Sequence, residues 1–211
     1  ARDGAARPQK NELKPWKKVG WVIPPEGNAD FVAAMEKVLD VYRRPYDASR
    51  PVVCMDETPR QLIRETKMPM PALPGRPERH DYEYERCGIC NVFMACEPLA
   101  GKRMTKVTER KTRSDWARFL QDIAGRYGGA EKITLVMDNL STHTPGALYA
   151  AFAPAEAKAL WERFEFVYTP KHGSWLNMAE IELNVMIRQC LSRRVSSVQE
   201  LAGSVLAWQS H

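Results

Sequence analysis

Apolar and polar residues follow two different periods along the chain, and these periods predict strands and helices. Five segments have the pattern of β-strands. Three of them are short and almost uniformly apolar, namely 51–55, 133–137 and 164–168, and two are longer, namely 82–97 and 102–110. Short apolar strands are typical of sheets that are covered on both faces. The two longer segments are joined by a turn at Pro98–Gly101, which predicts a hairpin.

Amphipathic helices are predicted around these strands. They are recognised by apolar residues that recur with a helical period or by capping signals at their ends. The predicted helices are 30–43, 114–128, 145–163 (one or two helices), 175–191 and a last helix from Ser196 or Ser197 onward. Ser114 is the predicted N-cap of the second helix, because serine accepts a hydrogen bond from a free backbone N–H. Strands joined by a hairpin and then by helices predict an α/β fold, with a mixed five-stranded sheet and helices on both faces.

Two segments lack a regular pattern. Residues 1–28 are polar, basic and interrupted by prolines, which predicts a basic linker or arm before a single domain at 29–211. Such an arm either lies along nucleic acid or is a solvated tail. Residues 66–81 contain four prolines and are predicted to form a loop.

Composition narrows the function only slightly. The 211 residues include 31 Lys+Arg against 26 Asp+Glu, and this basic balance permits a nucleic-acid partner without requiring one. No apolar run is long enough to cross a membrane and no leader peptide is recognisable, so a cytoplasmic location is expected. Five cysteines indicate free thiols, and Cys87-x-x-Cys90 lacks a second ligand pair for zinc.

Two carboxylates follow the apolar strands directly. Asp138 comes after the strand at 133–137, and Asp56 comes after the strand at 51–55. If the strand at 51–55 is central, both carboxylates fall on neighbouring strands at one edge of the sheet, where open α/β folds place ligands. The alternative is that Asp138 and Asn139 only end a strand, since both residue types favour turns.

A third carboxylate is predicted on the helix that follows Trp175. Glu180 and Glu182 lie on opposite shoulders of its apolar stripe, and the helical period leaves both open, as well as a solvated position for either. Carboxylate oxygens favour Mg²⁺ or Mn²⁺ over softer metals. Three converging acids therefore indicate metal-assisted phosphodiester chemistry, in which two cations activate the attacking oxygen and stabilise the leaving one.

Three motifs resemble the signatures of DDE transposases, in particular the bacterial insertion-sequence branch of the mariner-like superfamily. They are Met55-Asp-Glu-Thr58, Val136–His143 and Pro170–Glu180, and the resemblance runs from about Trp16 to the end of the chain. It implies an RNase H-like fold with Asp56, Asp138 and Glu180 as catalytic and metal-binding residues, and it selects Glu180 over Glu182.

The resemblance also implies a cofactor and partners. Two Mg²⁺ ions, replaceable by Mn²⁺, would support cleavage of double-stranded DNA at transposon ends and joining to a TA target. The full-length protein is expected to act as a homodimer on bacterial DNA in the cytoplasm. The helix-turn-helix part that such proteins carry at their amino terminus is not found in this sequence, so weak and unspecific DNA binding is expected.

Further residues receive supporting roles. Asn139 and His143 match the second motif and are expected to orient Asp138 or to contact the scissile phosphate, and His172 is expected to contact DNA. An ordinary hydrogen-bonded loop position is the alternative for each histidine. Trp175 is expected to be a core anchor rather than a base-stacking residue. A basic strand and the loop after it are a candidate DNA track or a solvated edge: Lys102, Arg103, Lys106, Arg110, Lys111 and Arg113.

Two rival functions remain open from the sequence. One is an RNase H-like nuclease or resolvase that cuts DNA without joining it. The other is a catalytically inactive DNA-binding protein derived from a transposase. Strand-transfer products would exclude the first, and the presence of three acids argues against the second.

Overall fold

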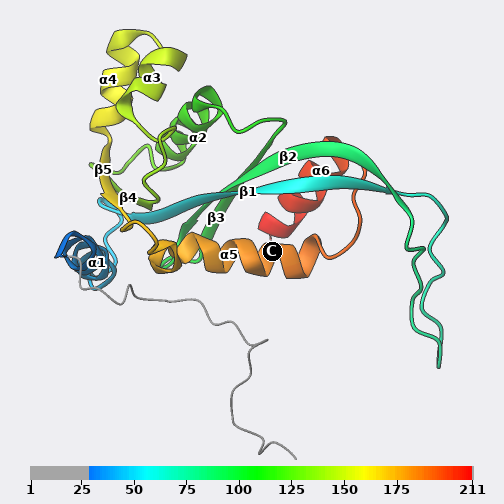
Figure 1. Cartoon of the computed structure of the whole chain (residues 1–211). Helices are drawn as coiled ribbons and strands as arrows, with labels where there is room; N and C mark the ends of the chain where they lie inside the picture. Colours follow the sequence, from blue (N-terminus) through cyan, green and yellow to red (C-terminus); the bar gives the residue numbers. More distant parts are fainter. Residues whose placement is uncertain (1–28, 211) are drawn as a thin grey trace, which may run out of the picture.

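A mixed five-stranded sheet forms the centre of the protein (Figure 1). The computed structural model describes residues 29–210, so the predicted basic arm at 1–28 lies outside the described residues. The strand order is β3–β2–β1–β4–β5, with β1 parallel to β4, β4 parallel to β5, and β2 antiparallel to both β1 and β3. The strands are β1 (Val52–Glu65), β2 (Tyr84–Glu97), β3 (Lys102–Thr108), β4 (Ile133–Met137) and β5 (Phe164–Tyr168). The predicted sheet is confirmed, and the strand that contains Asp56 is central.

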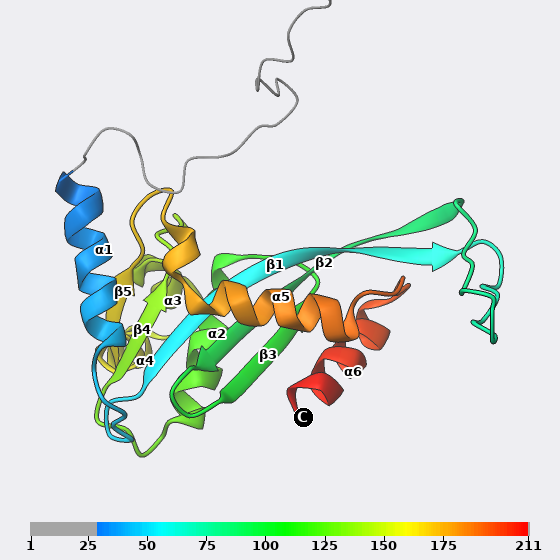
Figure 2. The same ribbon diagram turned by 90° about the horizontal axis from the view of Figure 1, so that it is seen from below.

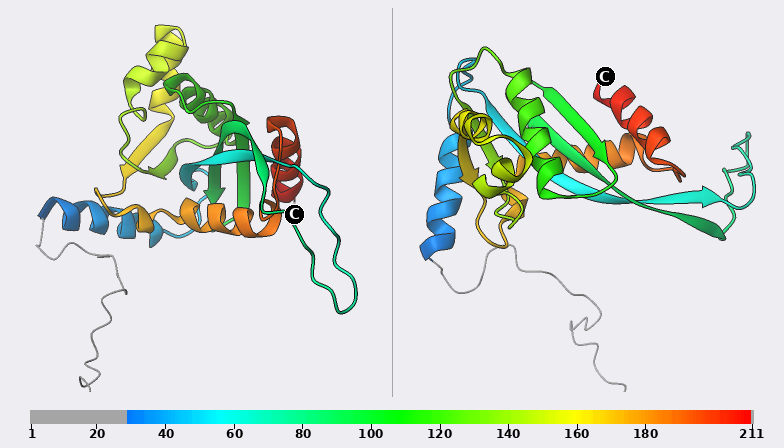
Figure 3. Two further views of the ribbon diagram at one scale, coloured as in Figure 1. Left: turned by 45° about the vertical axis from the view of Figure 1, so that its right-hand side comes forward. Right: turned by 90° about the horizontal axis from the view of Figure 1, so that it is seen from above.

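Helices cover both faces of this sheet, as predicted (Figures 1 and 3). They are α1 (Ala29–Tyr42), α2 (Arg113–Arg126), α3 (Pro145–Ala151), α4 (Pro154–Glu162), the 3₁₀ turn η1 (Ser174–Leu176), α5 (Met178–Cys190) and α6 (Val198–Gln209). Apolar residues of α2, α3 and α4 pack in one core on one face, and those of α1, α5 and α6 pack on the other face. Among residues 29–210 we find no helix with the length and apolar character needed to span a membrane.

The alternation of side chains along β1 assigns its residues to the two faces. Val53 and Met55 lie in the core beneath α2, whereas Cys54 lies in the core beneath α1 and α5. Successive side chains of a strand point to opposite faces. Asp56 therefore lies on the α5 side of the sheet, and Glu57 lies on the α2 side.

The strand β1 is longer than its apolar run predicts. It continues to Glu65 and pairs with β2 along this whole length, so the two strands form a hairpin that projects from the body of the protein (Figure 2). The residues of this extension have no strand-like apolar period, and tertiary contacts hold them in a strand. They pair with β2, Leu62 is buried against α5 and α6, and the Ile63 N–H donates to the backbone oxygen of Val195 at 2.7 Å. The register shifts between Leu62 and Ile63, opposite Gly88, whose φ of 110° suits glycine.

Two predicted helix starts are wrong. The N-cap of α2 is Thr112 and not Ser114, because Thr112 and Asp115 form a reciprocal capping box. The helix α5 begins at Met178, three residues after the predicted start, because Asn177 caps it. Trp175 consequently lies in the preceding 3₁₀ turn, where it is 43% exposed and is not a core anchor.

Candidate active site

Asp56 and Asp138 lie side by side at one edge of the sheet. The parallel strands β1 and β4 pair Val52 with Thr134 and Cys54 with Val136. Two positions further along each strand, this register brings Asp56 opposite Asp138. The two carboxylates therefore share the edge where the parallel pairing of β1 and β4 ends, although β1 itself continues past Asp56 to Glu65 in its pairing with β2.

The helix α5 brings a third acid to the same edge. Glu180 lies in its first turn, one turn after the N-cap Asn177. The Asn177 side chain is buried and donates a hydrogen bond of 2.8 Å to the backbone oxygen of Met55, the residue before Asp56. One buried amide thus joins the start of α5 to the end of the apolar part of β1.

The pKa of Asp56 reports how these acids affect one another. Burial raises it from 3.8 to about 7, and the negative charges of Glu57, Asp138 and Glu180 add to the rise. The backbone N–H of Glu57, which donates to Asp56 Oδ1 at 2.8 Å, opposes it. The three predicted acids are therefore close enough to repel one another in the absence of a cation.

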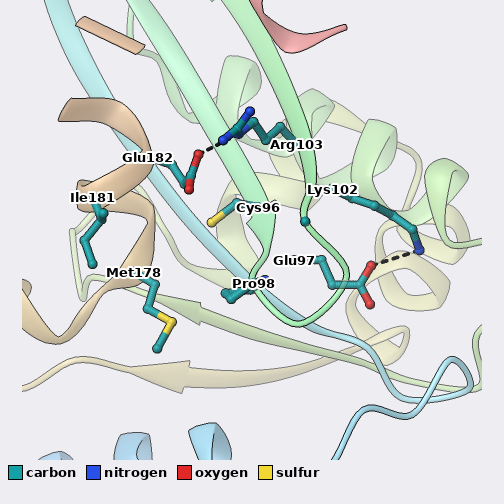
Figure 4. Close-up of a pocket in the computed structure, with 9 residues that line it drawn as sticks. Cys96, Glu97, Pro98, Lys102, Arg103, Met178, Ile181 and Glu182 are labelled. Carbon is teal, nitrogen blue, oxygen red and sulfur yellow. Dashed lines mark hydrogen bonds and ion pairs between the residues drawn. The ribbon is translucent and has the colours of Figure 1, made fainter. Parts of the chain in front are cut away.

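Glu182 occupies a different place. Its carboxylate lies 2.6 Å from Arg103 Nε, and both residues line a pocket of about 160 Å³ between α5 and the β2–β3 turn (Figure 4). The charge of Glu180, by contrast, is among those that raise the pKa of Asp56. The helical period could not choose between Glu180 and Glu182 as the third acid, and the ion pair of Glu182 with Arg103 favours Glu180.

A buried group of charges lies behind Asp138. His143 is stacked on Trp116, with ring centroids 5.2 Å apart, and its Nδ1 lies 2.8 Å from Asp138 Oδ1. Its Nε2 lies 3.5 Å from Glu57 Oε2, and Lys111 Nζ lies 2.7 Å from the other oxygen of Glu57. The sequence showed that Glu57 is adjacent to Asp56 but assigned it no role, because the partners of Glu57 are distant in the chain.

The charges in this group stabilise one another. Burial alone would lower the pKa of His143, but the carboxylates of Asp138 and Glu57 outweigh it and raise the pKa to about 9. Burial would likewise raise the pKa of Glu57, but His143 and Lys111 hold it below its usual value. At neutral pH His143 is therefore an imidazolium between two carboxylates.

The other two supporting residues lie at the surface. Asn139 is exposed directly after Asp138. His172 is exposed and has a φ of 65°, an uncommon left-handed conformation for a residue other than glycine. The loop around it is tight, because a Cβ on Gly173 would come within 2.5 Å of Pro170 Cγ. Contact of either residue with DNA stays a prediction.

The six basic residues do not form a single row. Strand alternation sends Arg103 toward Trp208 and Glu182 on one face, whereas Lys102 and Lys106 reach Glu97 and Asp122. Lys111 is paired with Glu57, as described above. Within residues 29–210, the side chains of Arg110 and Arg113 are exposed and have no ion-pair partner.

The acids fit a divalent cation by their chemistry and charge. Their donors are all carboxylate oxygens, and Asp56 is held near several like charges. Over the part of the chain that the structure describes, no three His, Cys, Asp or Glu side chains already form a compact ligand set. The fit therefore rests on donor type and uncompensated charge.

Comparisons with known proteins agree with this geometry. Residues 51–202 match the family described as DDE superfamily endonuclease. No curated protein matches the chain. The fold is similar to that of Mos1 transposase in a paired-end complex with the left transposon end, with a TM-score of 0.61 and 16% identity over 92% of this chain and 59% of that one.

Two further solved structures have the same likeness. The Mos1 mariner paired-end complex with Mn has a TM-score of 0.58 and 18% identity, over 92% of this chain and 59% of that one. The Mos1 strand transfer complex has a TM-score of 0.60 and 15% identity, over 92% of this chain and 58% of that one. The chain thus spans about three fifths of the length of these transposases, and the likeness concerns the fold. With the family match covering most of its length, this RNase H-like chain belongs to the DDE superfamily endonucleases.

Proposed function

We propose that this chain is the catalytic domain of a transposase that cleaves DNA at transposon ends and joins the freed end to a TA target. The observation that carries the proposal is the meeting of Asp56, Asp138 and Glu180 at one sheet edge, with the pKa of Asp56 raised to about 7. Family membership supports the cleavage step, and the Mos1 fold supports the joining step.

Asp56, Asp138 and Glu180 would hold two Mg²⁺ ions, or Mn²⁺ in their place. When bound, the ions activate the attacking oxygen and stabilise the leaving oxygen of the phosphodiester. Asp56 and Asp138 reach this edge from rigid, paired strands, and Glu180 reaches it from a capped helix start. Their own contribution is to hold negative charge at fixed positions around the scissile phosphate.

Arg110 and Arg113 are proposed DNA contacts, because both are exposed without an ion-pair partner among residues 29–210 and they flank Lys111, which touches Glu57, the neighbour of Asp56. Replacing Arg110 and Arg113 by alanine should lower the salt dependence of DNA binding by about one unit of log–log slope for each lost phosphate contact. Fluorescence anisotropy over a range of salt concentrations measures this slope. As a control, Lys158→Ala on α4 removes one positive charge from an exposed i,i+4 pair and should leave the slope unchanged.

A homodimer is the proposed assembly on DNA. Mos1 transposase is described in a paired-end complex, and pairing of two ends by this protein would require two active sites. Light scattering of the protein with a terminal DNA fragment tests this. A single copy on paired ends would contradict it.

The central experiment measures cleavage and joining by the full chain. Supercoiled DNA that carries the parental element ends and a TA-containing target plasmid are incubated with Mg²⁺, with Mn²⁺ and with a chelator. Cleavage should require the metal, and the freed 3′ ends should appear joined to the target. Asp138→Asn, which keeps the shape but removes the charge, should abolish both products. Undiminished cleavage by this variant would contradict the proposal, and cleavage without joining would indicate a nuclease.

A further inference from the structure

A row of four charged side chains runs through the α2 side of the protein behind the candidate metal-binding edge. The row is Lys111, Glu57, His143 and Asp138, with successive closest atoms 2.7, 3.5 and 2.8 Å apart. The side chains of Glu57 and His143 are each only 1% exposed, whereas that of Asp138 is 27% exposed. The row thus leads from solvent at Lys111, through the interior, to a carboxylate at the active edge.

The orientation of the His143 ring is determined from three directions. Trp116 stacks on it at an interplanar angle of 22°, which sets the plane of the ring. Glu57 lies on the side of Nε2, and Asp138 lies on the side of Nδ1. The ring N–H bonds do not point along the lines to these oxygens, so the contacts are ion pairs without well-aligned hydrogen bonds.

The buried His143 determines which oxygen of Asp138 is accessible. Asp138 Oδ1 faces His143 and is inaccessible to solvent, although the side chain as a whole is partly exposed. The accessible part of the carboxylate is therefore its Oδ2 side, at the edge shared with Asp56. A buried carboxylate such as Glu57 is costly and adds little net stability even when it is paired. Its position next to the active edge is better explained by its effect on the His143 ring.

We propose that Glu57 is a positioning residue for Asp138: it holds the His143 ring so that Asp138 turns one oxygen inward and offers the other at the active edge. Lys111 anchors Glu57 from the solvent side. The inference rests on the proposed metal-dependent function and adds to it a residue that touches neither metal nor DNA. Groups of this kind, which orient a metal ligand from behind, typically change metal affinity or activity by about 10- to 100-fold.

A double-mutant cycle tests the pathway through His143. Glu57→Ala and His143→Ala are made singly and together, and the cleavage rate and the Mg²⁺ concentration for half-maximal rate are measured at saturating DNA. Each single variant should slow cleavage about 10- to 100-fold and raise the Mg²⁺ requirement. The double variant should be no slower than the slower single variant, because both changes remove the same support. Multiplied losses would overturn the proposal.

An isosteric variant separates positioning from folding. Glu57→Gln keeps the volume of the side chain but removes its charge, so it should raise the Mg²⁺ requirement as Glu57→Ala does. A loss of thermal stability with an unchanged Mg²⁺ requirement would show a merely structural role and contradict the inference. The matched control is Glu162→Gln on α4, whose carboxylate is 64% exposed in a pair with Lys158 and which should match the unmodified protein.

Crystal structures distinguish a failure of this inference from a failure of the proposed function. If the unmodified protein shows no metal-dependent cleavage, the proposed function fails, and the structure of Glu57→Gln then decides the inference. A rotated His143 ring and a separation from Asp138 Oδ1 clearly longer than 2.8 Å would support it. An unchanged ring and carboxylate would overturn it.

Discussion

Replacing Asp56 by asparagine is expected to abolish metal-dependent cleavage and, at the same time, to stabilise the metal-free protein above pH 7. When several catalytic groups act together at the reacting atoms, removing one of them, here the Asp56 carboxylate, lowers turnover on the order of 10³-fold or more. The gain in stability has a separate cause. Burial and the charges of Glu57, Asp138 and Glu180 raise the pKa of Asp56 to about 7, so ionisation is unfavourable in the folded state.

The direction of the pH effect follows from proton binding. Between pH 3.8, the ordinary pKa of this carboxyl, and about 7, the folded protein keeps a proton on Asp56 that the unfolded chain has lost. The contribution of Asp56 to stability is therefore fully present below about pH 4 and is lost as the pH rises through about 7. The pKa difference corresponds to at most about 4 kcal/mol, and access of water to the carboxylate reduces this to roughly 1–2 kcal/mol.

Thermal unfolding at pH 5 and pH 8 measures this effect. At pH 8 the metal-free Asp56→Asn variant should unfold several degrees higher than the unmodified protein, and at pH 5 the difference should shrink. Added Mg²⁺ should stabilise the unmodified protein and have little effect on the variant. Asp122→Asn, at an exposed carboxylate of α2 paired with Lys106, is the control and should leave cleavage unchanged. Lower stability of Asp56→Asn at pH 8 would contradict the raised pKa.

Replacing Asn177 by alanine is expected to destabilise the protein by roughly 2–4 kcal/mol and to slow cleavage. The Asn177 side chain accepts the N–H of Ala179 at 3.1 Å and donates to the backbone oxygen of Met55 at 2.8 Å. Its removal costs about 1 kcal/mol for the lost cap and about 1–3 kcal/mol for the buried carbonyl left without a partner. Because this amide joins the Glu180 helix to the Asp56 strand, cleavage should fall about 10- to 100-fold.

The cap of α6 provides a matched control. Ser197 accepts the N–H of Glu200 at 3.2 Å, away from the three acids. Ser197→Ala should lower stability by about 1 kcal/mol and leave the cleavage rate unchanged at a temperature where both variants are folded. Chemical denaturation and single-turnover cleavage measure the two quantities. A destabilised Asn177→Ala protein that cleaves at the normal rate would refute its positioning role.

Local pattern was sufficient for most of the architecture. The strands at 133–137 and 164–168 were predicted to the residue, because a buried strand needs a continuous apolar run and its ends are marked by polar residues. The amphipathic period of α1 was correct to within one residue at each end. Local pattern failed where stability comes from distant segments, as in the extension of β1 to Glu65, which pairs with β2 and donates a backbone hydrogen bond from Ile63 to Val195.

In the candidate site, too, some residues could be predicted from local pattern and others could not. Asp56 and Asp138 could be found because each follows an apolar run, although Asp56 lies within β1 and not after it. Asn177 with Glu180 three residues later has the pattern of a helix start, which the start predicted at Trp175 missed. Glu182 could not be separated from Glu180 by the helical period, because the partner that occupies it, Arg103, is 79 residues away. Lys111 is predicted to contact DNA, which stays a prediction, and its ion pair with buried Glu57 could not be foreseen because the two residues are 54 positions apart.

The sequence by itself determined the class of fold and, through its motifs, the family, and it singled out three acids as the candidate site. Only the tertiary structure decided the register that brings Asp56 level with Asp138, the face of the sheet that each β1 side chain occupies, and the partners of Glu57 and Asn177. The physical reason is the sequence separation over which each interaction acts. Hydrophobic period and capping act between residues a few positions apart, whereas a buried charge or amide is satisfied by whichever groups the packed sheet and helices bring to it.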